Sequence, residues 1–195
     1  MWHRFPTGET ASMRTTETDL FLNWARDNGI GCDPRFQPPQ TLVYLHGENE
    51  SGHFRYPDSP TSIPWFTEEI LTAIGPWKEC WAYRRSDDWR CPDADEPYGR
   101  VWTAVVRSLG IAEGDSFVVG FARSEMDSLI TLAFATICFG WCVYDDLFIV
   151  PDHAQHILYF DHHEMVHVDC RERGSFASLV EALRREGIET EPTGG

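Results

Sequence analysis

Apolar residues recur along this 195-residue chain with two different spacings, and each spacing predicts a different kind of element. Apolar positions three and four residues apart, bounded by capping or breaking residues, predict helices. Short apolar runs rich in β-branched and aromatic residues predict strands. The predicted helices cover residues 17–28, 65–74, 99–109, 124–140 and 175–186. The predicted strands cover residues 41–46, 80–85, 116–121, 142–150 and 156–160, with a further strand around residues 165–169.

This order of elements predicts a single α+β domain over residues 16–195, with a mixed or antiparallel sheet. In the C-terminal part of the chain, the pattern predicts a β-meander over about residues 142–170, flanked by the helices at about 124–140 and 175–186. Residues 1–15 are polar and aperiodic, so we expect a flexible N-terminal segment. Residues 47–64 contain glycine, proline and many polar residues, and predict a long irregular loop.

Five of the eight histidines lie in residues 151–170, and one group of them spells H-E-x-x-H. On a helix, His163 and His167 would share one face, where both imidazoles could bind one zinc ion. Over these five residues the segment resembles the zincin metallopeptidases. That resemblance implies zinc ligation by His163 and His167, with Glu164 as the general base and Glu181 or Glu186 as a third ligand.

The same residues also predict a β-hairpin, which we favour, with residue 160 paired to 166 and 158 to 168. One face of this hairpin would then be wholly apolar, and it carries Leu158, Phe160, Val166 and Val168. β-Branched Val166 and Val168 suit a strand better than a catalytic helix. Asp161 and Asp169 also stand where zincin helices usually carry uncharged residues. We therefore predict no catalytic residue and no cofactor, with the zinc hydrolase as the alternative.

The hairpin suggests a second metal hypothesis. Pairing across it places His156 opposite Cys170 and near His153, and a nitrogen and sulfur set of this kind can hold zinc. Half-buried histidines with structural roles are the simpler interpretation, so no metal is our expectation here as well. The adjacent pair Asp145 and Asp146 would point to opposite faces of a strand. The pair either marks a bend or bulge, or places one carboxylate in the core, where it needs a partner.

Composition narrows the class of protein. Hydrophobic residues make up 42% of the chain and aromatic residues 13%, enough for a packed core. Sixteen Lys and Arg against thirty-one Asp and Glu give a net charge of −15, which disfavours nucleic acid as a partner. No apolar run is long enough for a membrane span or a signal peptide, and the six cysteines form no C-x-x-C pair. We expect a cytoplasmic protein without a membrane partner.

A negative charge of this size attracts basic proteins, so our leading hypothesis is a non-catalytic acidic protein-binding domain, of the inhibitor or immunity kind. Tryptophans and acids crowd residues 77–98, and we expect the contact surface there or in the 47–64 loop. The predicted contact residues are Trp77, Trp81, Trp89, Asp87, Asp88, Asp93, Asp95 and Glu96. The zinc hydrolase and a structural domain without a ligand are the two alternatives.

Overall fold

A computed structural model describes residues 18–35, 40–85, 89–91, 93–111, 118–143 and 146–188 of the protein. The helices are α1 (Thr18–Asp27), α2 (Ile63–Ala73), α3 (Pro97–Ser108), α4 (Met126–Val143) and α5 (Ser175–Arg185), with 3-10 turns η1 (Pro60–Ser62) and η2 (Arg123–Glu125). The strands are β1 (Ile30–Arg35), β2 (Gln40–Leu45), β3 (Glu50–Arg55), β4 (Glu79–Arg84), β5 (Val118–Ala122), β6 (Leu147–Pro151), β7 (His156–Phe160) and β8 (Met165–Cys170). This is the predicted α+β fold.

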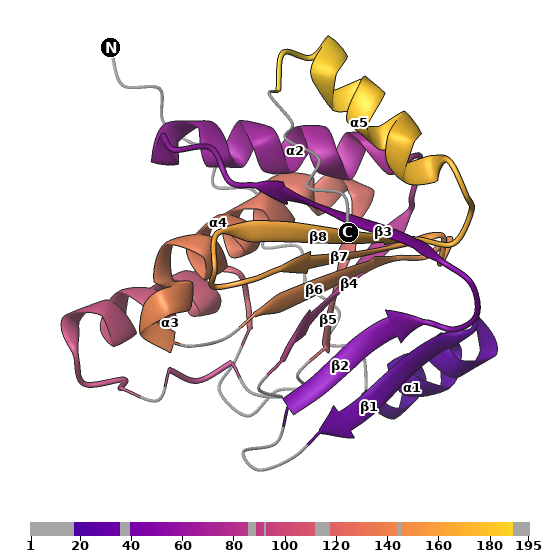
Figure 1. The fold of residues 1–195 in the computed structure, drawn as a ribbon. Coiled ribbons are helices and arrows are strands. Elements are labelled where there is room, and N and C mark those ends of the chain that lie inside the picture. Colours follow the sequence, from indigo (N-terminus) through magenta and orange to yellow (C-terminus); the bar gives the residue numbers. More distant parts are fainter. Residues whose placement is uncertain are drawn as a thin grey trace.

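Six strands form one antiparallel sheet in the order β3-β8-β7-β6-β4-β5, and β1 and β2 form a separate antiparallel hairpin. Helices α2 to α5 lie on one side of the large sheet, and the β1–β2 hairpin with α1 lies on the other (Figure 1). None of the described helices is both long and apolar enough to cross a membrane.

The central strands are buried on both faces, and alternation along them builds two separate cores. On β6, Leu147 and Ile149 point to the core under the helices, whereas Phe148 and Val150 point to the core under the hairpin. Helix α1 contributes Phe21 to that second core. The sheet is therefore the middle of three layers.

The predicted hairpin is confirmed, including its register. Strands β7 and β8 pair Phe160 with Val166 and Leu158 with Val168, and all four side chains are fully buried. The meander is also confirmed, with strands β6, β7 and β8 as sheet neighbours.

Three predicted boundaries were wrong. Residues 47–64 contain strand β3, and strand β1 occupies Ile30–Arg35, between the first predicted helix and the first predicted strand. The strand expected over 142–150 begins only at Leu147, because α4 continues to Val143. In β3, Phe54 is the only fully buried side chain. The strand is therefore defined by its hydrogen-bonded pairing with β8 and not by an alternation of buried and exposed side chains.

Candidate functional site

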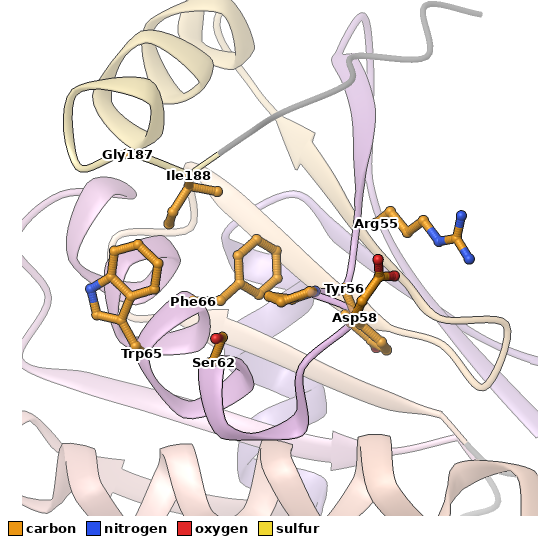
Figure 2. A pocket seen from close by; sticks show the side chains of 9 residues that line it. Arg55, Tyr56, Asp58, Ser62, Trp65, Phe66, Gly187 and Ile188 are labelled. Atoms are coloured by element: carbon orange, nitrogen blue, oxygen red, sulfur yellow. The ribbon is translucent and has the colours of Figure 1, made fainter.

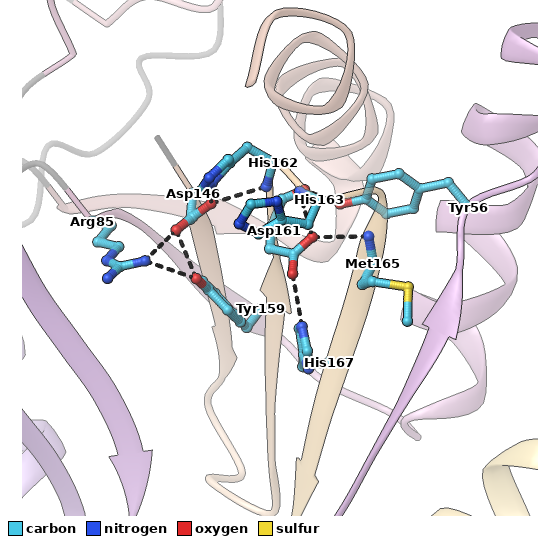
Figure 3. A network of polar contacts seen from close by, with 9 residues as sticks. All are labelled: Tyr56, Arg85, Asp146, Tyr159, Asp161, His162, His163, Met165 and His167. Atoms are coloured by element: carbon cyan, nitrogen blue, oxygen red, sulfur yellow. Dashed lines mark hydrogen bonds and ion pairs between the residues drawn. The ribbon is translucent and has the colours of Figure 1, made fainter. Parts of the chain in front are cut away.

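Asp146 is the centre of a polar network at the end of β6 where the β7–β8 turn lies (Figure 3). One carboxylate oxygen, Oδ2, accepts hydrogen bonds from Arg85 Nη1 at 2.6 Å and from the Tyr159 hydroxyl at 2.6 Å. The other oxygen, Oδ1, accepts the backbone N–H of His162 at 3.0 Å and lies 2.7 Å from its Nδ1. Asp146 is only 1% exposed. The sequence left open whether one carboxylate of the Asp145 and Asp146 pair faces the core and has a partner there, and Asp146 does both. Asp145 lies outside the described residues.

Asp161 holds the turn between β7 and β8 in a similar way (Figure 3). Its Oδ1 accepts the backbone N–H groups of His163 and Met165, both at 2.9 Å. Its Oδ2 lies 2.8 Å from His167 Nε2. The Tyr56 hydroxyl donates to the Asp161 carbonyl at 3.1 Å. Asp161 thus ties the turn to β8 and to the segment after β3.

Hydrogen bonding decides the charge of both carboxylates. Burial alone would raise the pKa of Asp146, but its hydrogen bonds, that from Tyr159 foremost, outweigh burial and lower it. The pKa of Asp161 is lowered in the same way, chiefly through its hydrogen bond with His167. Both groups are therefore ionised at neutral pH and act as acceptors.

The pairing of His167 with Asp161 has the form of a base oriented by a carboxylate. For such a base to act in catalysis, a nucleophile or a substrate proton must lie within hydrogen-bond distance of the imidazole. Within the described residues, Asp161 is the only hydrogen-bond partner of the His167 imidazole, and the neighbouring rings are His53 and Tyr159. The Tyr159 hydroxyl donates to Asp146, and burial followed by that bond raises its pKa. The network holds the hairpin in place, and no nucleophile among the described residues is hydrogen-bonded to the His167 ring.

The helical H-E-x-x-H arrangement is not formed. His163 and Glu164 lie in the turn and His167 lies in β8, and Glu164 has the left-handed backbone angle φ of 67°. The side chains of His163 and Glu164 are exposed, and Glu164 pairs with Arg55 at 3.5 Å. The zincin interpretation fails because a strand and a tight turn replace the helix that would align its ligands.

The other suggested ligands are also separated. Glu181 pairs with Arg184 on α5, and Glu186 follows that helix as an exposed residue. His156 does pair with Cys170 across the hairpin as predicted, and the rings of His153 and His156 lie 5.5 Å apart. Nevertheless, no three His, Cys, Asp or Glu side chains among the described residues gather closely enough to hold a metal ion.

The three tryptophans expected at a contact surface lie in the cores, with Trp77 4%, Trp81 8% and Trp89 3% exposed. Trp77 donates to the Leu71 carbonyl, and the guanidinium of Arg123 covers its ring at 4.6 Å. These indoles are packed in the cores and cannot contact a partner. The prediction that the three tryptophans form a contact surface was therefore wrong. Asp87 and Asp88 lie outside the described residues, whereas the acids before α3 are exposed: Asp93, Asp95 and Glu96.

Trp65 on α2 is 42% exposed, and it is the exposed one among the tryptophans whose side chains the structure describes. The sequence did not single it out. It lies beside a cavity of about 420 Å³ between the segment after β3, α2 and the end of α5 (Figure 2). Tyr56, Phe66 and Ile188 supply further apolar surface, and Asp58 lies at the opposite side of the cavity from Trp65. The predicted contact loop, residues 47–64, ends directly before Trp65. Nothing in the sequence distinguished this tryptophan from the buried ones.

A second cavity, of about 320 Å³, lies on the other side of the sheet, between β2 and strands β6 to β8. It is lined by Val43, Tyr44, Phe148, Ile157, Tyr159, His167 and Asp169.

The chain is thus a three-layer antiparallel α+β protein with an open cavity beside Trp65 and a mostly apolar cavity under β2 that contains Asp169. Comparison of the chain with protein-family models, with curated proteins and with solved structures finds no significant match in any of the three.

Proposed function

We propose that this protein is a non-catalytic acidic binding domain that holds a basic protein partner in the cytoplasm, as inhibitors and immunity proteins hold theirs. The observation that carries the proposal is Trp65, an indole 42% exposed beside an open cavity. Tryptophan is among the residues most enriched at the energetic centres of protein interfaces, because it buries a large area with few rotatable bonds.

Charge around this cavity suits a basic partner. Asp58 lines it, and Glu186 precedes the lining residue Gly187. Glu68 lies three residues after Trp65 on α2, which places it one helical turn away on the same side. The cation of the cavity, Arg55, is already paired with Glu164. Exposed acids beside an apolar centre can form part of the polar rim of an interface, and negative charge accelerates association with a basic protein.

The outer face of α3 is a second candidate surface for the same function, because it places apolar side chains beside the acids named from the sequence. Val101 is 50% exposed and lies in a groove with Pro97 and Ala104. Asp95 and Glu96 are exposed just before this helix. Acids at the start of a helix also stabilise its dipole, so they serve the fold here whether or not a partner binds.

Site-specific photocrosslinking in cells tests the proposal and separates the two surfaces. A benzophenone side chain is placed at Trp65, at Val101, or at Leu20, which is 60% exposed on α1 and is the control. We expect a basic protein to be crosslinked from position 65 and not from position 20. Crosslinking from position 101 alone would move the contact to α3. An acidic partner, or equal yields from positions 65 and 20, would refute the proposal.

The purified pair then gives the energetics. Trp65→Ala should weaken binding by about 30-fold or more, the effect of losing a central interface residue of about 2 kcal/mol. Asp58→Asn should weaken binding less and reduce its dependence on salt, because a rim charge acts mainly on association. The matched control is Asp19→Asn, which removes an exposed acid on α1.

A further inference from the structure

We propose that the cavity between β2 and strands β6 to β8 binds a small organic cation, whose ammonium or guanidinium group pairs with the carboxylate of Asp169. This site is separate from the Trp65 cavity, because the two cavities lie on opposite faces of the large sheet. Its success or failure is therefore independent of the proposed function.

Sheet register brings the lining residues together. Phe148 on β6 is opposite Tyr159 on β7, which in turn is opposite His167 on β8. Ile157 on β7 is opposite Asp169 on β8, so all five side chains share the face that β2 covers. With a volume of about 320 Å³, the cavity is at the lower end of the range for small-molecule sites.

Within the described part of the chain, Asp169 is the carboxylate on this face whose side chain has no partner. Asp146 is paired with Arg85, and Asp161 is paired with His167. By contrast, the half-buried side chain of Asp169 forms no hydrogen bond or ion pair with any residue that the structure describes, and the charge of His167 acts to lower its pKa. Burial consequently raises its pKa. A half-buried carboxylate is partly desolvated, and a cation that enters the cavity offsets this loss of solvation.

The walls of the cavity favour a cation as well. Three of the lining residues are aromatic, and the rings of Phe148 and Tyr159 stack with centroids 4.6 Å apart. Aromatic rings attract ammonium and guanidinium groups through their quadrupoles. The third ring, Tyr44, is packed flat onto Gly31, where a Cβ would lie 2.3 Å from its Cζ, so this wall is held in place by a glycine.

The charge of the surroundings excludes the other ligand classes. Among the described residues, three carboxylates face this side of the sheet, those of Asp146, Asp161 and Asp169. The two guanidinium groups on this side are already engaged, Arg85 by Asp146 and Arg171 by the carbonyls of Ala154, Asn28 and Gly29. An anion would be repelled, and a neutral ligand would leave Asp169 desolvated and unpaired. A compact cation with an apolar stem matches both the carboxylate and the aromatic and aliphatic walls.

An NMR titration with butylguanidinium tests the site, and its neutral isostere butylurea is the control ligand. At about pH 8, where Asp169 is ionised, we expect butylguanidinium to shift the amide signals of β2, β7 and β8 and to bind at least about tenfold more tightly than butylurea. Equal affinity for the two ligands, or shifts confined to other strands, would overturn the proposal. This comparison uses the unmodified protein, so it needs no variant to fold.

Variants locate the charge. Asp169→Asn should weaken butylguanidinium binding at least about tenfold, while the matched control Glu172→Gln, an exposed acid in the turn after β8, leaves it unchanged. Tyr44→Leu should weaken binding severalfold. Unchanged affinity in a folded Asp169→Asn variant would refute the pairing. A short peptide with one central arginine, bound more tightly than butylguanidinium, would identify a side chain of a partner as the source of the cation.

Discussion

Lowering the pH from 7 to 5 should destabilise the protein through His156, at the start of β7. Burial, and after it the nearby His153, lowers the pKa of His156 from 6.5 to about 4. Its Nδ1 is buried and has no hydrogen-bond partner among the described residues, which leaves nothing to stabilise the protonated ring. His156 is therefore neutral in the folded protein at pH values where it is protonated in the unfolded chain.

The sign and size of the effect follow from proton linkage. Between about pH 6.5 and 4 the unfolded chain binds a proton that the folded protein does not, so the free energy of unfolding falls as the pH falls. The full difference between the two pKa values corresponds to about 3.4 kcal/mol, and about 2 kcal/mol of it is reached at pH 5. The ring is partly exposed, and solvent screening reduces the expected loss at pH 5 to about 1–1.5 kcal/mol.

Urea unfolding of the parent protein and of His156→Phe, each at pH 7 and at pH 5, measures this loss. The phenylalanine keeps a ring of similar size and does not titrate, so the variant should lose about 1–1.5 kcal/mol less than the parent between the two pH values. His163→Gln, which removes an exposed histidine in the β7–β8 turn, should behave like the parent. If His156→Phe loses as much stability as the parent, His156 is not the buried base described here.

Three further changes test the packing of the sheet by the same unfolding measurement. Gly52→Ala should cost about 1–3 kcal/mol, because a Cβ at this position would lie 2.1 Å from Cζ of Phe176 on α5; unchanged stability would mean that the ring does not rest on the strand. Asp146→Asn should cost about 2–3 kcal/mol, since it leaves Arg85 without its buried counter-charge, and a neutral effect would remove the network from the forces that hold the turn. Leu158→Ala should cost about 2–5 kcal/mol through the cavity it leaves, and a loss below 1 kcal/mol would contradict the tight core under the helices.

Much of the C-terminal half of the fold could be predicted because its strands carry their own burial pattern. The apolar face shared by Leu158 and Val168 was readable from alternation alone, and with it the register of the hairpin. Strand β3 was not predictable in this way, since its partner β8 lies more than a hundred residues away and the segment buries little but Phe54. Pairing between distant segments is a property of the folded sheet, which no local pattern records.

The candidate sites were harder to predict than the fold. The sequence marked Asp145 or Asp146 as a carboxylate that needs a partner if it faces the core, but the partners of Asp146, which are Arg85, Tyr159 and His162, come from separate segments. Tryptophan in an acidic segment is compatible with a core or with a surface, and only packing separates exposed Trp65 from its buried counterparts. Asp169 was visible in the sequence as a departure from zincins, and only the structure shows that its side chain has no partner among the described residues.

The position of β3 beside β8 also governs when this sheet can be completed. Glu50 is paired with Cys170, so the first strand of the large sheet gains its neighbour only after about 120 further residues have been added. On the ribosome, β3 therefore waits while the central strands β4, β5 and β6 assemble, and its N–H and C=O groups are open to other chains during that time. Any chain that stops before β8 loses both the turn network and the edge strand, and we expect such fragments to aggregate instead of folding into smaller stable proteins.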